Sequence, residues 1–150
     1  QSMFELGDGK INQDIVLPAE SLDAYFEYFK NLGMEYKLAT PVFGHAGDGN
    51  YHIHFMYKSS DPTGRARALE AMDKAISRAV EVGGAVSGEH GIGFLKSKYM
   101  PKQHTPTELE LMRAIKKIFD PQDILNRGKI LTPVDTSNLR PLSGVKLPWD

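Results

Sequence analysis

The chain has 150 residues, of which 41% are hydrophobic and 25% charged, as expected for one globular domain. Its formal net charge of −1 excludes a strong electrostatic attraction to nucleic acid or to an anionic membrane surface. The sequence has no cysteine, no signal-peptide pattern and no apolar run near the roughly 18 residues of a transmembrane helix, so we expect a cytoplasmic protein without a transmembrane segment.

Hydrophobic periodicity predicts a strand, a helix, two strands, a helix, a short strand and then C-terminal helices. The predicted elements are a strand at 11–17, a helix at about 19–32 ended by Gly33, extended segments at 38–43 and 50–57, a helix at about 62–82 capped by Asp61, and a strand at 84–87. This β-α-β-β-α-β order is typical of an α+β, ferredoxin-like fold, in which an antiparallel sheet carries its helices on one face.

The helix predicted at about 106–119 has a clear start, because Thr105 and Glu108 form a capping-box pattern around Pro106. A further short helical turn is expected from 120 to about 126. The apolar residues of the first of these helices predict a buried face made of Leu109, Met112, Ile115, Ile118 and Phe119. Residues 132–150 contain three prolines and little periodicity, so they are expected to form an extended tail.

Two glycine-rich segments carry most of the candidate chemistry: GHAGDGNYHIHF at 44–55 and SGEHGIG at 87–93. The Asp48-Gly49 dipeptide favours a tight turn, which would bring His45 near His52. His54 shares a strand face with His52. Glu89 would have to approach from the second segment. Histidine nitrogens and a glutamate oxygen together are a ligand set for zinc or manganese.

The simpler alternative is that these histidines are packed or surface residues of a sheet, and that Asp48 and Asn50 only shape the turn. His90 is a candidate general base because it lies beside a carboxylate in a glycine-rich loop, and the alternative is a solvated loop residue. The sequence has no P-loop, no GxGxxG between a strand and a helix, no HExxH and no GxSxG.

The segments GHAGDGNYHIHF, SGEHGIG and FDPQDILNRGKIL, in this order, resemble the C-terminal domain of FAD-linked oxidases of the D-lactate dehydrogenase, D-2-hydroxyglutarate dehydrogenase and glycolate oxidase type. The resemblance implies that residues 1–131 are the substrate-cap part of such an oxidoreductase. It further implies that His45, His52 and Glu89 hold a divalent metal, Zn or Mn. In such enzymes His90 would take the hydroxyl proton of a small 2-hydroxy acid while hydride passes to FAD, giving a 2-oxo acid.

The resemblance also assigns roles outside the metal ligands. Asn126, Gly128 and Lys129 match a loop that lies near the flavin in relatives, although the proline of that loop is replaced here. His54 and Asn50 are substrate-binding candidates, and His54 stands where hydroxyglutarate-type relatives carry asparagine.

Members of the family have an N-terminal FAD-binding domain that this sequence lacks. The resemblance therefore implies a fragment, a truncated product or one subunit of a split enzyme, which is not active alone and needs an FAD-binding domain or subunit as its partner. Apolar surface left exposed on residues 106–131 would favour a homo-oligomer. The alternative is a non-catalytic metal-binding or assembly domain that remains after loss of the flavin domain.

Overall fold

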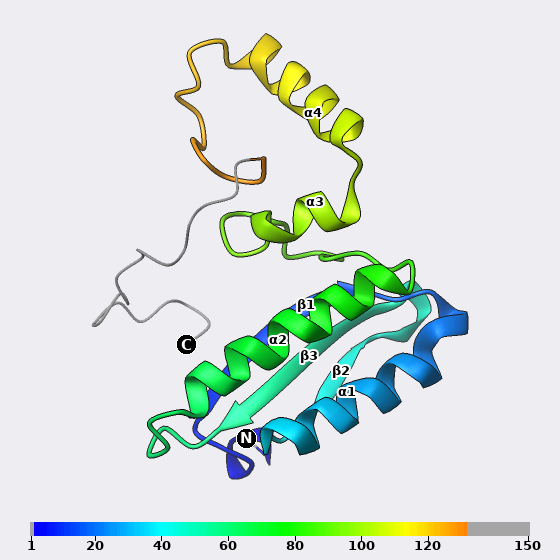
Figure 1. The fold of residues 1–150 in the computed structure, drawn as a ribbon, viewed down its shortest axis with the longest axis vertical. Helices are drawn as coiled ribbons and strands as arrows, with labels where there is room; N and C mark the ends of the chain where they lie inside the picture. Colours follow the sequence, from blue (N-terminus) through cyan, green and yellow to red (C-terminus); the bar gives the residue numbers. More distant parts are fainter. Residues whose placement is uncertain (1, 132–150) are drawn as a thin grey trace.

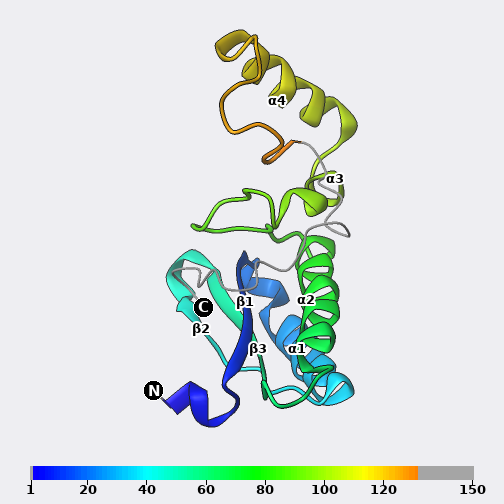
Figure 2. The ribbon, with the colours of Figure 1, turned by 90° about the vertical axis from the view of Figure 1, so that its left-hand side faces the viewer.

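The computed structural model describes residues 2–131 and is built on a three-stranded antiparallel sheet with strand order β1–β3–β2 (Figure 1). Two long helices, α1 and α2, cover one face of this sheet (Figure 2). This arrangement confirms the predicted α+β class. The elements are η1 (Ser2–Glu5), β1 (Gly9–Val16), η2 (Ala19–Ser21), α1 (Leu22–Tyr36), β2 (Val42–His45), η3 (Ala46–Asp48), β3 (Asn50–Tyr57), α2 (Gly64–Glu81), η4 (Ser97–Tyr99), α3 (Met100–Gln103) and α4 (Pro106–Phe119).

The central strand β3 begins and ends as its alternating sequence predicted. Ile53 and Phe55 are fully buried in the core between the sheet and the two helices, where Phe55 packs against Phe29 of α1 with ring centroids 4.8 Å apart. Successive side chains of a strand point to opposite faces, so His52 and His54 lie on the face that α1 and α2 leave uncovered. The sheet therefore has an apolar face that stabilises the fold and a polar face that carries the histidines.

The strand predicted at 84–87 is wrong, because only one antiparallel bridge forms there, between Ala85 and Val16. Ala85 exchanges two hydrogen bonds with Val16, of 2.9 and 3.0 Å, on the edge of β1 that does not face β3. After this bridge the ladder stops, because the Ser87 hydroxyl and the Gly88 N–H donate to the side chain of Asp14 instead. A side chain of β1 thus replaces the continuation of a fourth strand.

Two predicted helix boundaries are also wrong. The helix α1 continues through Gly33 and ends at Tyr36, and the C-cap residue Lys37 adopts left-handed backbone angles with a φ of 54°. Gly33 is needed for close packing, since a Cβ atom there would lie 2.5 Å from the Thr40 side chain. At the start of α2 the N-cap position is Thr63 rather than Asp61. The Asp61 carboxylate lies just before the helix and accepts hydrogen bonds from the N–H and hydroxyl groups of Thr63.

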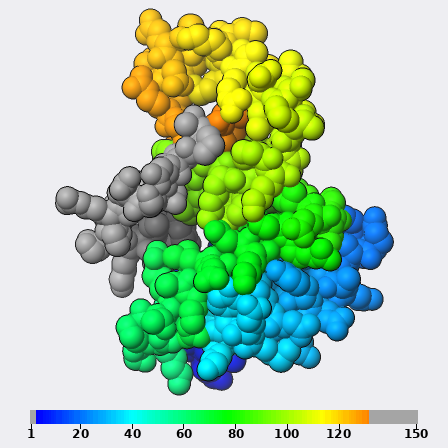
Figure 3. Space-filling view, in the orientation of Figure 1, coloured from blue at the N-terminus to red at the C-terminus, as the bar shows by residue number. Residues whose placement is uncertain are grey.

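The helix α4 begins at Pro106 with the predicted capping box, in which Thr105 Oγ1 accepts the Glu108 N–H and Glu108 accepts the Thr105 N–H. Its predicted buried face is wrong, since only Leu109 is buried and Phe119 is 82% exposed. The space-filling view shows the reason: α4 projects beyond the body that the sheet, α1 and α2 form (Figure 3).

The helical turn predicted from 120 to 126 does not form. The buried Asp120 carboxylate instead accepts the N–H groups of Ile124 and Leu125 and closes a non-helical loop. The predicted tail at 132–150 lies outside the described residues. None of the helices in residues 2–131 has the length and apolar character needed to cross a membrane.

Candidate metal centre

The hairpin between β2 and β3 brings His45 and His52 together, as the Asp48-Gly49 turn signal predicted. The imidazole centroids of the two histidines lie 5.9 Å apart. Gly49 adopts a φ of 65° in the connection. Gly44 permits the strands to close, because a Cβ atom at this position would lie 2.2 Å from the Asn50 carbonyl oxygen. Glycine is therefore required directly before the first histidine, at Gly44, and in the connection, at Gly49.

Glu89 reaches the two histidines from the loop that follows Ala85. Its Oε1 atom lies 3.0 Å from Nε2 of His52 and 3.9 Å from Nε2 of His45. One potential ligand atom from each of the three residues lies within 4.8 Å of the others. The structure thus brings together the three residues that the sequence singled out as candidate ligands.

The donor set suits a divalent transition metal. Metal–nitrogen and metal–oxygen bonds of about 2.0–2.2 Å place two ligands of one ion roughly 3–4 Å apart, so small side-chain adjustments would close the site. The side chain of His52 is 11% exposed, whereas those of His45 and Glu89 are 59% and 45% exposed. An ion held from the sheet side would therefore keep coordination positions open toward solvent, as catalytic sites do.

His90 lies at the side of this cluster, with its ring centroid 5.1 Å from that of His52. Its Nδ1 atom is 3.4 Å from the Asp14 carboxylate, and its Nε2 atom is 3.7 Å from Glu89 Oε1. The side chain is 49% exposed. One ring nitrogen thus faces a buried carboxylate, while the ring remains accessible to a small molecule.

Asp14 and Lys96 are central to the site and were missed in the sequence. Asp14 is fully buried and Lys96 is 3% exposed, and the two side chains form an ion pair. Burial alone would raise the pKa of Asp14, but the Lys96 ammonium and the N–H groups of Glu89 and His90 outweigh it and hold the pKa well below its usual range. The available signal was an aspartate directly before the apolar run Ile15-Val16-Leu17 of a predicted strand, because a carboxylate buried at such a position needs a partner.

The two substrate-binding candidates are both buried within this chain. His54 is 2% exposed beneath Phe43, whose ring centroid lies 4.9 Å from the imidazole, and burial lowers the pKa of His54. Asn50 is 6% exposed and lies under Gly88, where its Oδ1 atom has no hydrogen-bond partner among the described residues. Both adjoin the histidine cluster, and their roles stay predictions.

The three flavin-proximal candidates lie together on a separate loop. The Lys129 ammonium donates to Asn126 Oδ1 at 2.9 Å and lies 5.6 Å from the ring centroid of Phe94. The Ile130 N–H donates to the Gly93 carbonyl at 2.9 Å. The loop is thus attached to the far end of the segment that carries Glu89 and His90, instead of to the histidines themselves.

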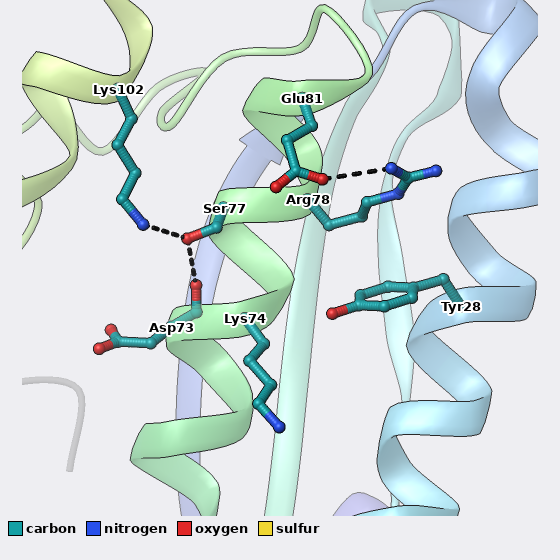
Figure 4. Close-up of a pocket in the computed structure, with 7 residues that line it drawn as sticks. All are labelled: Tyr28, Asp73, Lys74, Ser77, Arg78, Glu81 and Lys102. Carbon is teal, nitrogen blue, oxygen red and sulfur yellow. Dashed lines mark hydrogen bonds and ion pairs between the residues drawn. The ribbon is translucent and has the colours of Figure 1, made fainter.

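A shallow groove between α1 and α2 lies away from this centre, on the helical face of the sheet (Figure 4). Its charged groups already have partners: Arg78 pairs with Glu81 at 3.2 Å, and Lys102 donates to Ser77 at 2.7 Å. The groove therefore has the character of a solvated ion-pair surface and offers no free charge to a ligand. It is lined by Tyr28, Asp73, Lys74, Ser77, Arg78, Glu81 and Lys102.

Comparison with known proteins identifies related sequences over most of the chain. The family model for FAD linked oxidases, C-terminal domain, matches residues 5–130. The chain is 38% identical over 118 residues to a D-lactate dehydrogenase of Anaerostipes hadrus, which covers 78% of the chain and 25% of that protein. It is 39% identical over 116 residues to glycolate oxidase subunit GlcD of Escherichia coli K12, covering 77% of the chain and 23% of that protein. The chain thus spans about a quarter of the length of these relatives.

Proposed function

Because the chain belongs to the family of FAD linked oxidases, C-terminal domain, we propose that it is the metal- and substrate-binding part of a flavin-dependent D-2-hydroxyacid dehydrogenase. The observation that carries this proposal is the meeting of His45, His52 and Glu89 beside His90 on the open face of the sheet. An FAD-binding domain or subunit would complete the catalytic unit. The relatives that match the chain include a D-lactate dehydrogenase and a glycolate oxidase subunit, which favours a small 2-hydroxy acid as substrate.

The proposed ligands are His45, His52 and Glu89, and their nitrogen and oxygen donors suit Zn or Mn. When bound, such an ion makes a coordinated hydroxyl more acidic, and the flavin accepts the hydride. The residues of the chain bind and orient the substrate and move its proton.

His90 is the proposed base for the substrate hydroxyl. Asp14 faces Nδ1 at 3.4 Å, so Nε2 is the nitrogen left to take the proton. An imidazole is suited to this role because its ordinary pKa lies near neutral pH. His54 and Asn50 would shape the substrate pocket from below, and the loop of Asn126, Gly128 and Lys129 would face the flavin-binding partner.

The function can be tested by mixing the metal-loaded chain with an FAD-binding partner from the same source under anaerobic conditions. D-lactate, glycolate or D-2-hydroxyglutarate should bleach the visible absorbance of the flavin, whereas L-lactate serves as the stereochemical control. A folded complex that none of the three acids bleaches would contradict the dehydrogenase proposal. That result would favour the alternative, a non-catalytic metal-binding or assembly domain.

We also expect the chain to self-associate through α4 and the following loop when its flavin partner is absent. Several large apolar side chains there are more than half exposed, and contiguous patches of this kind favour association. They are Leu111, Ile115, Ile118, Phe119, Ile124 and Leu125.

The association is tested by light scattering of the wild-type chain and of Phe119→Asp. The substitution should shift a dimer or larger assembly toward monomer without lowering the melting temperature, because Phe119 is 82% exposed. Met34→Asp on α1 is the matched control, since Met34 is 62% exposed but lies outside the patch. A monomeric wild-type chain, or equal dissociation by both variants, would contradict this expectation.

A further inference from the structure

Asp14 collects the hydrogen-bond donors of the loop that contains Glu89 and His90. Its Oδ2 atom accepts the backbone N–H groups of Gly88, Glu89 and His90 at 2.6, 2.8 and 3.2 Å. The Ser87 hydroxyl donates to the same oxygen at 3.0 Å. Successive N–H groups that converge on one anion form a concave nest, here filled by a carboxylate of the protein itself.

Lys96 fixes the other side of the same carboxylate. Its ammonium contacts Asp14 Oδ1 and also donates to the backbone carbonyl of Asp14 at 2.9 Å. Residues 87–90 and residue 96 are therefore both held to one position of β1. Burying two charges is costly, and apolar side chains of similar volume often stabilise a fold equally well. A role beyond stability would explain why a charged pair occupies this position.

The register of the sheet places this anchor directly beside the candidate ligands. Asp14 is the cross-strand partner of His52, so the two side chains share one face of the sheet. Fixing the Glu89 and His90 amides on Asp14 sets the directions of both side chains. Glu89 then lies 3.0 Å from His52, and His90 turns its Nδ1 toward Asp14 at 3.4 Å.

We propose that Asp14 and Lys96 are a positioning pair that holds Glu89 in the place needed for metal binding and His90 beside it, an inference that rests on the proposed metal centre. Neither residue contacts the ion in this assignment. They act through the loop, as hydrogen-bonded groups behind metal ligands do, and loss of such groups typically lowers metal affinity about 10–100-fold.

The test compares Zn²⁺ affinities of the full 150-residue chain by competition with a chromophoric chelator. Asp14→Asn should bind Zn²⁺ about 10–100-fold more weakly than the wild-type chain. The double variant Asp14→Asn/Lys96→Met removes both charges and guards against misfolding caused by an unpaired lysine. It should bind as weakly as the single variant if the carboxylate positions the loop. Affinity restored to the wild-type value in the double variant would overturn the proposal and leave the pair a role in folding alone.

Asp120→Asn is the matched control. Asp120 is another buried aspartate that accepts two backbone N–H groups, from Ile124 and Leu125, and pairs with a lysine, Lys116, at 2.6 Å. It anchors a loop away from the histidines, so its substitution should leave Zn²⁺ affinity unchanged. An equal loss of affinity in this variant would show a general effect of loop anchoring on the fold and would contradict a specific role for Asp14.

Amide hydrogen exchange on the metal-free chain separates this inference from the proposed metal centre. Exchange at Gly88, Glu89 and His90 should be faster in Asp14→Asn than in the wild-type chain and unchanged in Asp120→Asn, because only the first variant weakens the acceptor of these three N–H groups. If the wild-type chain binds no Zn²⁺, the metal centre is wrong, and the exchange rates alone decide whether Asp14 holds the loop. Unchanged exchange in Asp14→Asn would overturn the inference whatever the metal result.

Discussion

Replacing His52 with alanine is expected to abolish stoichiometric metal binding, with a loss of affinity greater than about 100-fold. In the proposed centre three side chains supply the ligands, so each should contribute a large share of the metal affinity. Loss of a residue that only hydrogen-bonds to a ligand already lowers metal affinity about 10–100-fold. His52 is the most buried of the three candidate ligands, since its side chain is 11% exposed in the sheet, and its Nε2 atom lies 3.0 Å from Glu89 Oε1. The wild-type chain should retain close to one divalent ion after loading and desalting.

Elemental analysis and a Zn²⁺ titration of the reconstituted proteins measure this effect. His104→Ala is the matched control, because His104 also pairs with a glutamate, Glu108, at 3.9 Å but lies outside the candidate centre. The control should bind metal as the wild-type chain does. Equal metal content in wild type and His52→Ala would show that the ligand assignment is wrong.

Substitution of His90 should separate proton transfer from metal binding. In the complex with a flavin-binding partner, His90→Ala should lower the rate of flavin reduction by roughly 10²–10⁴-fold, the usual contribution of a general base, with little change in KM. The metal should remain bound, because the candidate ligands are His45, His52 and Glu89. Glu89→Ala should instead lose the metal and the activity together.

Flavin reduction by rapid mixing and the metal content of each variant provide the two readouts. Their combination decides the role of His90, which lies 3.7 Å from Glu89 and therefore close enough to the centre to be mistaken for a ligand. Loss of metal from His90→Ala would identify it as a ligand and contradict its assignment as the base. Full activity with bound metal would assign the proton transfer to another group.

Local sequence signals predicted the elements whose structure depends on their own residues. The alternation along β3 and the capping box of Thr105 and Glu108 both reappear in the structure at the expected positions. The turn at Asp48-Gly49 likewise predicted that His45 approaches His52. In each case the physical determinants lie within a few residues of one another.

Features that depend on distant contacts were not predictable in this way. Gly33 is a packing residue beneath Thr40 and does not end its helix, which only the tertiary structure reveals. The strand predicted at 84–87 does not form, because the side chain of Asp14, 74 residues before Gly88, accepts the Gly88 N–H in place of a neighbouring strand. Periodicity identified an apolar side of α4 but could not show what would cover it. The Asp14–Lys96 pair joins residues 82 positions apart and carries no local motif.

The alternation of β3 also determines which kinds of genetic change the protein can tolerate. Residues that hold the core, such as Ile53 and Phe55, alternate with His52 and His54 along one strand. A single substitution can therefore alter the packing of the core and leave the histidines unchanged, or the reverse. A deletion or insertion of a single residue cannot, because a one-residue slip moves every later side chain to the opposite face of the sheet. Such a slip would place imidazoles against α1 and α2 and expose the aromatic side chains of the core. The number of residues in β3 is therefore more strictly constrained than the identity of any one of them.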